Sequence, residues 1–101
     1  MANNNTKVWA LTQTIGENVS TSIVGVYTTK KDLERGARED LTNFWYDLPN
    51  LKDDRYLSIT VGELKQLTID AMAARLVEGK PVNGRTYHWY VQELELNKNV
   101  E

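Results

Sequence analysis

The sequence lacks cysteine and has one histidine (His88), two prolines and one phenylalanine among its 101 residues. Without cysteine, the chain cannot form a disulfide bridge, a thiolate zinc site or a thiol nucleophile. No stretch approaches the roughly 20 apolar residues of a membrane span, and the N-terminal residues lack the apolar core of a signal peptide. We therefore expect a cytoplasmic protein that makes no membrane contact.

Neither sign of charge predominates in the sequence. It has 12 Lys and Arg residues and 14 Asp and Glu residues, for a formal net charge of −2. A protein that binds the phosphate backbone normally presents a basic surface. The densest basic group, within residues 30–38, alternates with acidic residues and is typical of a solvated, salt-bridged helix face. Nucleic acid is therefore an unfavoured partner.

The remaining composition is that of a globular protein, with 41% hydrophobic and 26% charged residues. We expect a single α+β domain over residues 7–97, with flexible tails at residues 1–6 and 98–101. Its core architecture is an antiparallel sheet of three or four strands, with two helices packed on one face.

The strands are predicted from β-branched and aromatic runs. Residues 7–14 and 19–28 have this composition and flank a turn, which predicts a β-hairpin. An Asn83-Gly84 turn precedes a long final strand over residues 85–97. A short strand over residues 56–59 is a weaker prediction.

The helices are predicted from their end signals. A capping pattern beginning at Thr29 predicts a helix over residues 30–47, which Pro49 ends. A second capping box, beginning at Thr60, predicts a helix that ends at Gly79. Tyr46 lies nearly opposite the apolar stripe of the first helix, so it is a candidate contact residue for a protein partner.

The second predicted helix is apolar on two sides. Its two stripes are Leu64, Leu67, Ala71 and Ala74, and Val61, Ile69, Met72 and Leu76. Such a helix is buried on two sides, either inside the domain or at an interface with a partner. In the second case Ile69, Met72 and Leu76 are protein-binding candidates, and the partner could be another copy of the chain.

The final strand alternates two sets of side chains between its faces. We expect Leu94 and Leu96 to mark the core face, beneath the helices. Tyr87 and Trp89 then lie on the opposite face and are candidates for binding a protein partner. The alternative is that Trp89 packs across a neighbouring strand.

Catalytic and metal-binding patterns are absent from the sequence. His88 has no nucleophile or carboxylate at a spacing typical of a catalytic site. Asp53 and Asp54 do not continue into a calcium loop, and the glycines form no phosphate-binding loop. We therefore expect a protein that is not an enzyme and that has no cofactor and no metal.

The segment from Ile23 to Glu34 and the segment from Val91 to Asn97 resemble parts of small uncharacterised domains of bacterial and phage genomes. In those domains a first hairpin ends in Gly-Val/Ile-Tyr/Phe and leads into a Lys/Glu-rich helix. The resemblance covers residues 7–38 and 88–97. It implies a ββα…β fold and a prokaryotic or phage origin, and it implies no activity.

Two hypotheses of function follow. The first is a non-enzymatic binding protein encoded by a phage or mobile element, which acts stoichiometrically on a host protein in the host cytoplasm and inhibits host defence. The alternative is a protein that sequesters a small nucleotide signal in pockets at a subunit interface. There a base would stack on Trp89 or Tyr87 while Arg75 or Arg85 meets a phosphate.

Overall fold

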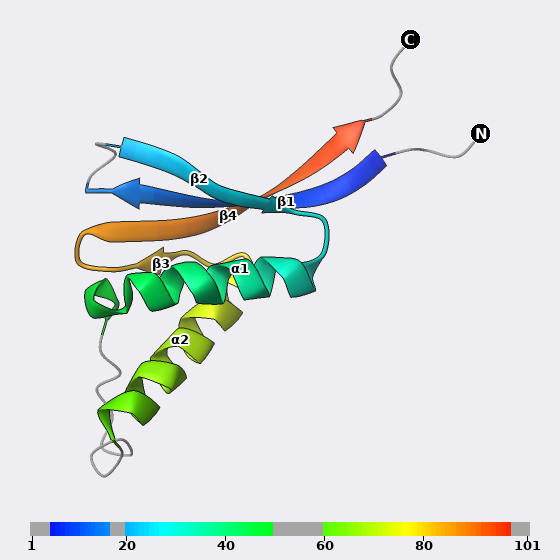
Figure 1. Cartoon of the computed structure of the whole chain (residues 1–101). Helices are drawn as coiled ribbons and strands as arrows, with labels where there is room; N and C mark the ends of the chain where they lie inside the picture. Colours follow the sequence, from blue (N-terminus) through cyan, green and yellow to red (C-terminus); the bar gives the residue numbers. More distant parts are fainter. Residues whose placement is uncertain (1–4, 17–19, 50–59, 98–101) are drawn as a thin grey trace.

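The computed structural model describes residues 5–16, 20–49 and 60–97. The chain forms a hairpin, then two helices, then a second hairpin (Figure 1). The elements are β1 (Asn5–Ile15), β2 (Ser20–Tyr27), α1 (Lys30–Asn43), the 3-10 turn η1 (Trp45–Asp47), α2 (Val61–Val77), β3 (Val82–Asn83) and β4 (Tyr87–Asn97).

The four strands form one antiparallel sheet in the order β2-β1-β4-β3. Both helices lie on the same side of this sheet, with α1 running beneath β1 and β2, and α2 packing against α1, β3 and β4 (Figure 1). The predicted α+β class and the arrangement of sheet and helices are confirmed. The other face of the sheet carries no helix in the described part of the chain.

Local hydrogen bonds explain why the helices begin and end near the predicted positions. The Thr29 hydroxyl accepts a 3.0 Å hydrogen bond from the amide of Asp32 and caps α1. Thr60 and Glu63 form the predicted capping box of α2, with 3.1 Å hydrogen bonds in both directions. Gly79 follows α2 with φ of +85°, a conformation that glycine adopts without strain.

The first helix is shorter than predicted. It ends at Asn43, and the chain tightens into the 3-10 turn η1. Asp47 in that turn is buried, and its carboxylate accepts hydrogen bonds from the amides of Thr86 and Tyr87 in the distant β3–β4 connection. This tertiary contact holds the turn after α1 against the second hairpin, and α1 itself ends several residues before Pro49. The predicted strand over residues 56–59 lies outside the described residues.

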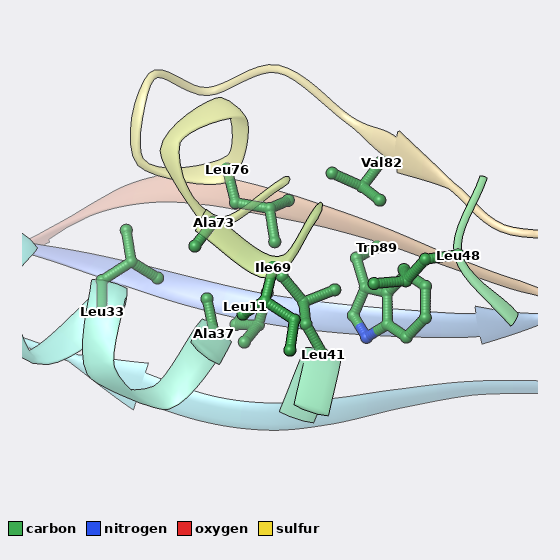
Figure 2. Close-up of a cluster of buried hydrophobic side chains, with 10 residues drawn as sticks. All are labelled: Leu11, Leu33, Ala37, Leu41, Leu48, Ile69, Ala73, Leu76, Val82 and Trp89. Carbon is green, nitrogen blue, oxygen red and sulfur yellow. The ribbon is translucent and has the colours of Figure 1, made fainter. Parts of the chain in front are cut away.

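The core lies between the sheet and the two helices (Figure 2). Its buried apolar side chains are Leu11, Leu33, Ala37, Leu41, Leu48, Ile69, Ala73, Leu76, Val82 and Trp89. The strands β1, β3 and β4 and the helices α1 and α2 therefore each contribute a buried residue to one continuous cluster.

The predicted faces of β4 are wrong. Trp89 is 0% exposed and lies in the core, and Tyr87 and Val91 pack beside it on the helix side. Leu94 is 40% exposed on the opposite face, and the side chain of Leu96 lies outside the described residues. Alternation along a strand separates two sets of side chains but does not tell which set the helices cover.

The second helix is buried inside the domain on one stripe and exposed on the other. Ile69 and Leu76 are buried, and Met72 packs against the same core. Ile69 and Leu76 are therefore buried inside the domain, where a partner does not reach them, whereas Met72 is only half-buried. Leu67, Ala71 and Ala74 of the other stripe are exposed.

Candidate functional site

The strongest candidate surface is the face of the sheet that points away from the helices, which we call the open face. The register between strands identifies its residues, because paired residues share a face. Val8, Ala10, Thr12 and Thr14 of β1 lie on it, since the alternate residues Leu11 and Gln13 contact the core and α1. Their strand partners on this face are Thr21, Ile23 and Val26 of β2, and His88, Tyr90, Gln92 and Leu94 of β4.

A β-bulge in β2 places two apolar residues, Ile23 and Val26, on the open face. Ile23 and Val26 are three residues apart, so a regular strand would send them to opposite faces. The register instead pairs Leu11 with Gly25 and Thr12 with Ile23, which leaves Val24 as an extra residue. Both Ile23 and Val26 consequently point away from the helices.

Large apolar side chains remain exposed on this face. Ile23 is 67% exposed, Val26 55%, Tyr90 41% and Leu94 40%. They lie on the strands that flank β1, whose own residues on this face are small and buried. The open face is therefore a continuous surface of apolar and uncharged side chains across three strands.

Charged residues of the described strands avoid the open face. Lys7, Glu93 and Glu95 all occupy the alternate positions, on the helix side of the sheet. Lys7 pairs with Glu93 at 3.5 Å, and the indole N–H of Trp9 donates to the same carboxylate at 3.2 Å. In an antiparallel sheet with one face on the core, the solvated face ordinarily carries the polar and charged residues. A solvated face without charged strand residues is therefore unusual.

The polar groups of the open face contact one another within the sheet. The hydroxyls of Thr14 and Thr21 lie 3.4 Å apart, across β1 and β2. The Nδ1 atom of His88 lies 3.1 Å from the side-chain oxygen of Asn83, across β4 and β3. These contacts confirm the register and show that His88 lies outside the core, on an uncharged surface.

The structure separates the aromatic candidates. Tyr46 is exposed, as expected. Tyr87 and Trp89 instead pack with Phe44, whose ring centroid lies 4.5 Å from that of Tyr87 and 6.2 Å from that of Trp89. Neither a protein partner nor a base can contact the fully buried Trp89, so its assignment to a binding surface is wrong.

The two arginine candidates do not form a phosphate site with Trp89. The guanidinium of Arg75 donates two hydrogen bonds, of 3.0 and 3.2 Å, to the carbonyl oxygen of Pro81, which joins α2 to the strand that follows. Arg85 is exposed, and its backbone amide donates to the carbonyl of Asp47. The nucleotide hypothesis therefore loses Trp89, one of its two stacking candidates, whereas Tyr87 is half-buried.

A shallow groove runs along the exposed side of α1, but its charges are mixed. Its lining residues are Lys31, Glu34, Arg35, Arg38, Glu39, Thr42 and Asn43. Arg38 is already bound by Glu34 at 3.0 Å and by Asp70 of α2. These contacts hold the pKa of Arg38 above its ordinary value. The groove is a salt-bridged helix surface, as the sequence predicts.

Sequence analysis missed the residues of the open face, although a signal was present. Along the final strand, Glu93 and Glu95 occupy odd-numbered positions, whereas Tyr90, Gln92 and Leu94 occupy even-numbered positions. Because alternate residues point to opposite faces, this pattern indicates that one face of the strand is charged and the other uncharged. The missing information was which set the helices cover.

Two further findings for the described residues concern metal sites and membrane spans. Among residues 5–16, 20–49 and 60–97, no group of three or more His, Asp or Glu side chains is placed to hold a metal ion. Neither described helix is long and apolar enough to cross a membrane. Comparisons with protein families, with curated proteins and with solved structures found no match to this chain.

Proposed function

We propose that this protein is a small non-enzymatic binding protein that acts stoichiometrically through the open face of its sheet. The observation that supports the proposal is that four apolar side chains are exposed on this face, while none of the described strand residues on it is Lys, Arg, Asp or Glu. Contiguous exposed apolar surface on a small protein marks an interaction site. Depletion of charged residues is the feature that distinguishes the centre of a protein interface from other surface.

The residues of the open face suit a protein partner better than a small ligand. Ligand sites are concave and bury most of the ligand surface. The open face is instead an extended sheet surface, and β1 contributes only small side chains at its centre. A flat surface with Tyr90 as an aromatic anchor matches the anatomy of a protein contact.

The resemblance to bacterial and phage domains supports a phage or prokaryotic origin, and by itself it implies no activity. For a protein of that origin we propose a host protein as the target and inhibition of host defence as the outcome. Tyr46 stays exposed outside the open face and is available for such a contact. Separate variants of Tyr46 and of the open face therefore tell which of these two surfaces contacts the target.

Cross-linking in a bacterial lysate tests the proposed function. We expect the tagged chain to give one dominant adduct at a defined mass ratio, with itself or with another protein. The double variant Ile23→Glu/Tyr90→Glu places carboxylates on the open face and should lose that adduct.

A matched control comes from α2, where Val61 and Leu67 are 71% and 39% exposed, close to the 67% and 41% of Ile23 and Tyr90. Val61→Glu/Leu67→Glu makes the same change of net charge, and we expect it to keep the adduct. A wild-type chain that gives no adduct with any protein would overturn the proposed function.

A further inference from the structure

We infer that the partner of the open face is a second copy of this chain, bound face to face in a two-fold dimer of stacked sheets. The inference rests on the proposed function and names the partner of the same surface. Two-fold dimers are the commonest assemblies, and their interfaces pair one surface patch with itself. The open face meets the two chemical conditions that such self-pairing imposes, and its area is sufficient.

The first condition concerns charge. A face that pairs with itself presents the same net charge on both sides, so a patch with charges of one sign repels its own copy. A different partner would not impose this condition, because it could present the opposite charge. None of the described strand residues on the open face carries a formal charge, whereas Lys7, Glu93 and Glu95 lie on the other side of the sheet.

The second condition concerns hydrogen bonding. A self-pairing surface needs both donors and acceptors, because a surface with donors alone would face only donors. Hydroxyl and amide groups can both donate and accept, whereas ammonium and carboxylate groups cannot. The hydroxyl and amide side chains on this face are Thr12, Thr14, Thr21, Asn83, Tyr90 and Gln92.

The area of the face is large enough for a weak dimer. With a rise of about 3.4 Å per residue and a spacing of about 4.8 Å between strands, the described strands present about 500 Å² per copy. Stacking two copies would remove about 1,000 Å² from water, which is at the lower limit for a specific interface. Stacked sheets lie about 10 Å apart, a distance that Ile23, Val26, Tyr90 and Leu94 of both copies would fill. An interface of this size is typical of weak or transient association, so we expect a weak dimer.

The test is the mass of the purified chain in solution, measured by sedimentation or light scattering from about 1 µM to 1 mM, a range suited to a weak interface of this size. We expect the wild-type chain to approach twice its 11.6 kDa as the concentration rises. Ile23→Glu/Tyr90→Glu should remain at the monomer mass over the whole range. Circular dichroism checks that the double variant is folded. If it is not, the single variant Val26→Glu replaces it in the same measurement and should also remain monomeric.

The α2 control identifies which surface forms the dimer. Val61→Glu/Leu67→Glu carries the same added charge at closely matched exposure, and we expect it to dimerise like the wild type. Loss of the dimer in this control alone would place the interface on α2 and overturn the inference. A wild-type chain that stays monomeric to 1 mM would also overturn it. In that case an adduct with another protein in the lysate would still support the proposed function.

Discussion

The indole N–H of Trp89 donates a 2.7 Å hydrogen bond to a carboxylate oxygen of Asp40, which ties the beginning of β4 to α1. The same oxygen accepts a 3.0 Å hydrogen bond from the side-chain amide of Gln13 on β1. Three elements therefore meet at one oxygen atom, beside an otherwise apolar cluster. This contact lets a tryptophan be fully buried, because its only polar atom has a partner inside the protein.

Replacing Asp40 by alanine should destabilise the fold, because the buried indole N–H of Trp89 and the amide of Gln13 lose their acceptor. Each buried polar group left without a partner costs about 1–3 kcal/mol. Urea denaturation of Asp40→Ala measures the loss. Glu39→Ala, at the neighbouring exposed position, should change stability by less than about 0.5 kcal/mol. Equal losses in the two variants would show that the hydrogen bonds contribute little.

Asp47 should have a comparable effect through the backbone of the second hairpin. Its carboxylate accepts hydrogen bonds of 2.9 Å from the amide of Thr86 and 2.8 Å from the amide of Tyr87. In Asp47→Ala these two amides lose their acceptor, at about 1–3 kcal/mol each where they stay buried. Hydrogen exchange should accelerate at Thr86 and Tyr87 more than in the centre of β1. Unchanged exchange at these amides would contradict the proposed anchoring of the hairpin.

Gly36 should respond to substitution against the usual helix propensity. In an exposed helix interior, Gly→Ala stabilises by about 1 kcal/mol. At position 36, however, a Cβ atom would lie only 2.8 Å from Cε1 of Tyr27, whose ring packs over this glycine. We therefore expect Gly36→Ala to destabilise the wild-type chain.

The double-mutant cycle with Tyr27→Ala isolates the steric cause of that loss. Once the ring is removed, Gly36→Ala should stabilise by about 1 kcal/mol, as propensity predicts. Thermal or urea denaturation of the four proteins in the cycle gives the coupling. Stabilisation by Gly36→Ala in both backgrounds would mean that Tyr27 moves away at little cost.

The contact between α1 and α2 should weaken in acid. Hydrogen bonds from Arg38, and then from Gln66 at 2.9 Å, hold the pKa of Asp70 below its ordinary value. A carboxyl group with a lowered folded pKa contributes stability that is complete above the unfolded pKa and is lost as the pH falls through the folded pKa. For Asp70 this loss begins near the ordinary pKa of about 3.9 and continues below it.

Urea denaturation of the wild type and Asp70→Asn between about pH 5 and pH 2 measures this dependence. We expect the wild type to lose more stability than the variant, by at most about 1 kcal/mol because the ion pair is partly exposed. Glu39→Gln removes the same charge from a neighbouring exposed position and should follow the wild type. Parallel curves for all three proteins would show that the Arg38–Asp70 pair does not stabilise the fold.

Helix starts could be predicted because their causes are local. Thr29 and Thr60 cap helices through amides three residues away, and Gly79 ends a helix through its own conformation. The end of α1 was not predictable in this way. In the turn after α1, the carboxylate of Asp47 accepts hydrogen bonds from amides 39 and 40 residues further along the chain. No local pattern encodes that pairing.

The candidate site was mispredicted for a related reason. The alternation of Trp89 with Tyr90 along β4 is the same whichever face is covered, and only the contact of Trp89 with Asp40, 49 residues away, selects the face. The bulge at Val24 that places Ile23 and Val26 together likewise exists only in the pairing of β2 with β1. Both features depend on partners that sequence periodicity does not identify.

The sequence by itself therefore determined the order and most boundaries of the elements, the α+β class and the separation of charged from uncharged residues along the final strand. Local hydrogen bonds and side-chain periodicity suffice for these properties. The tertiary structure decided which side of the sheet the helices cover, and hence that Trp89 is core and that Ile23, Val26, Tyr90 and Leu94 are exposed. A strand offers two equivalent faces until packing and long-range hydrogen bonds bury one of them.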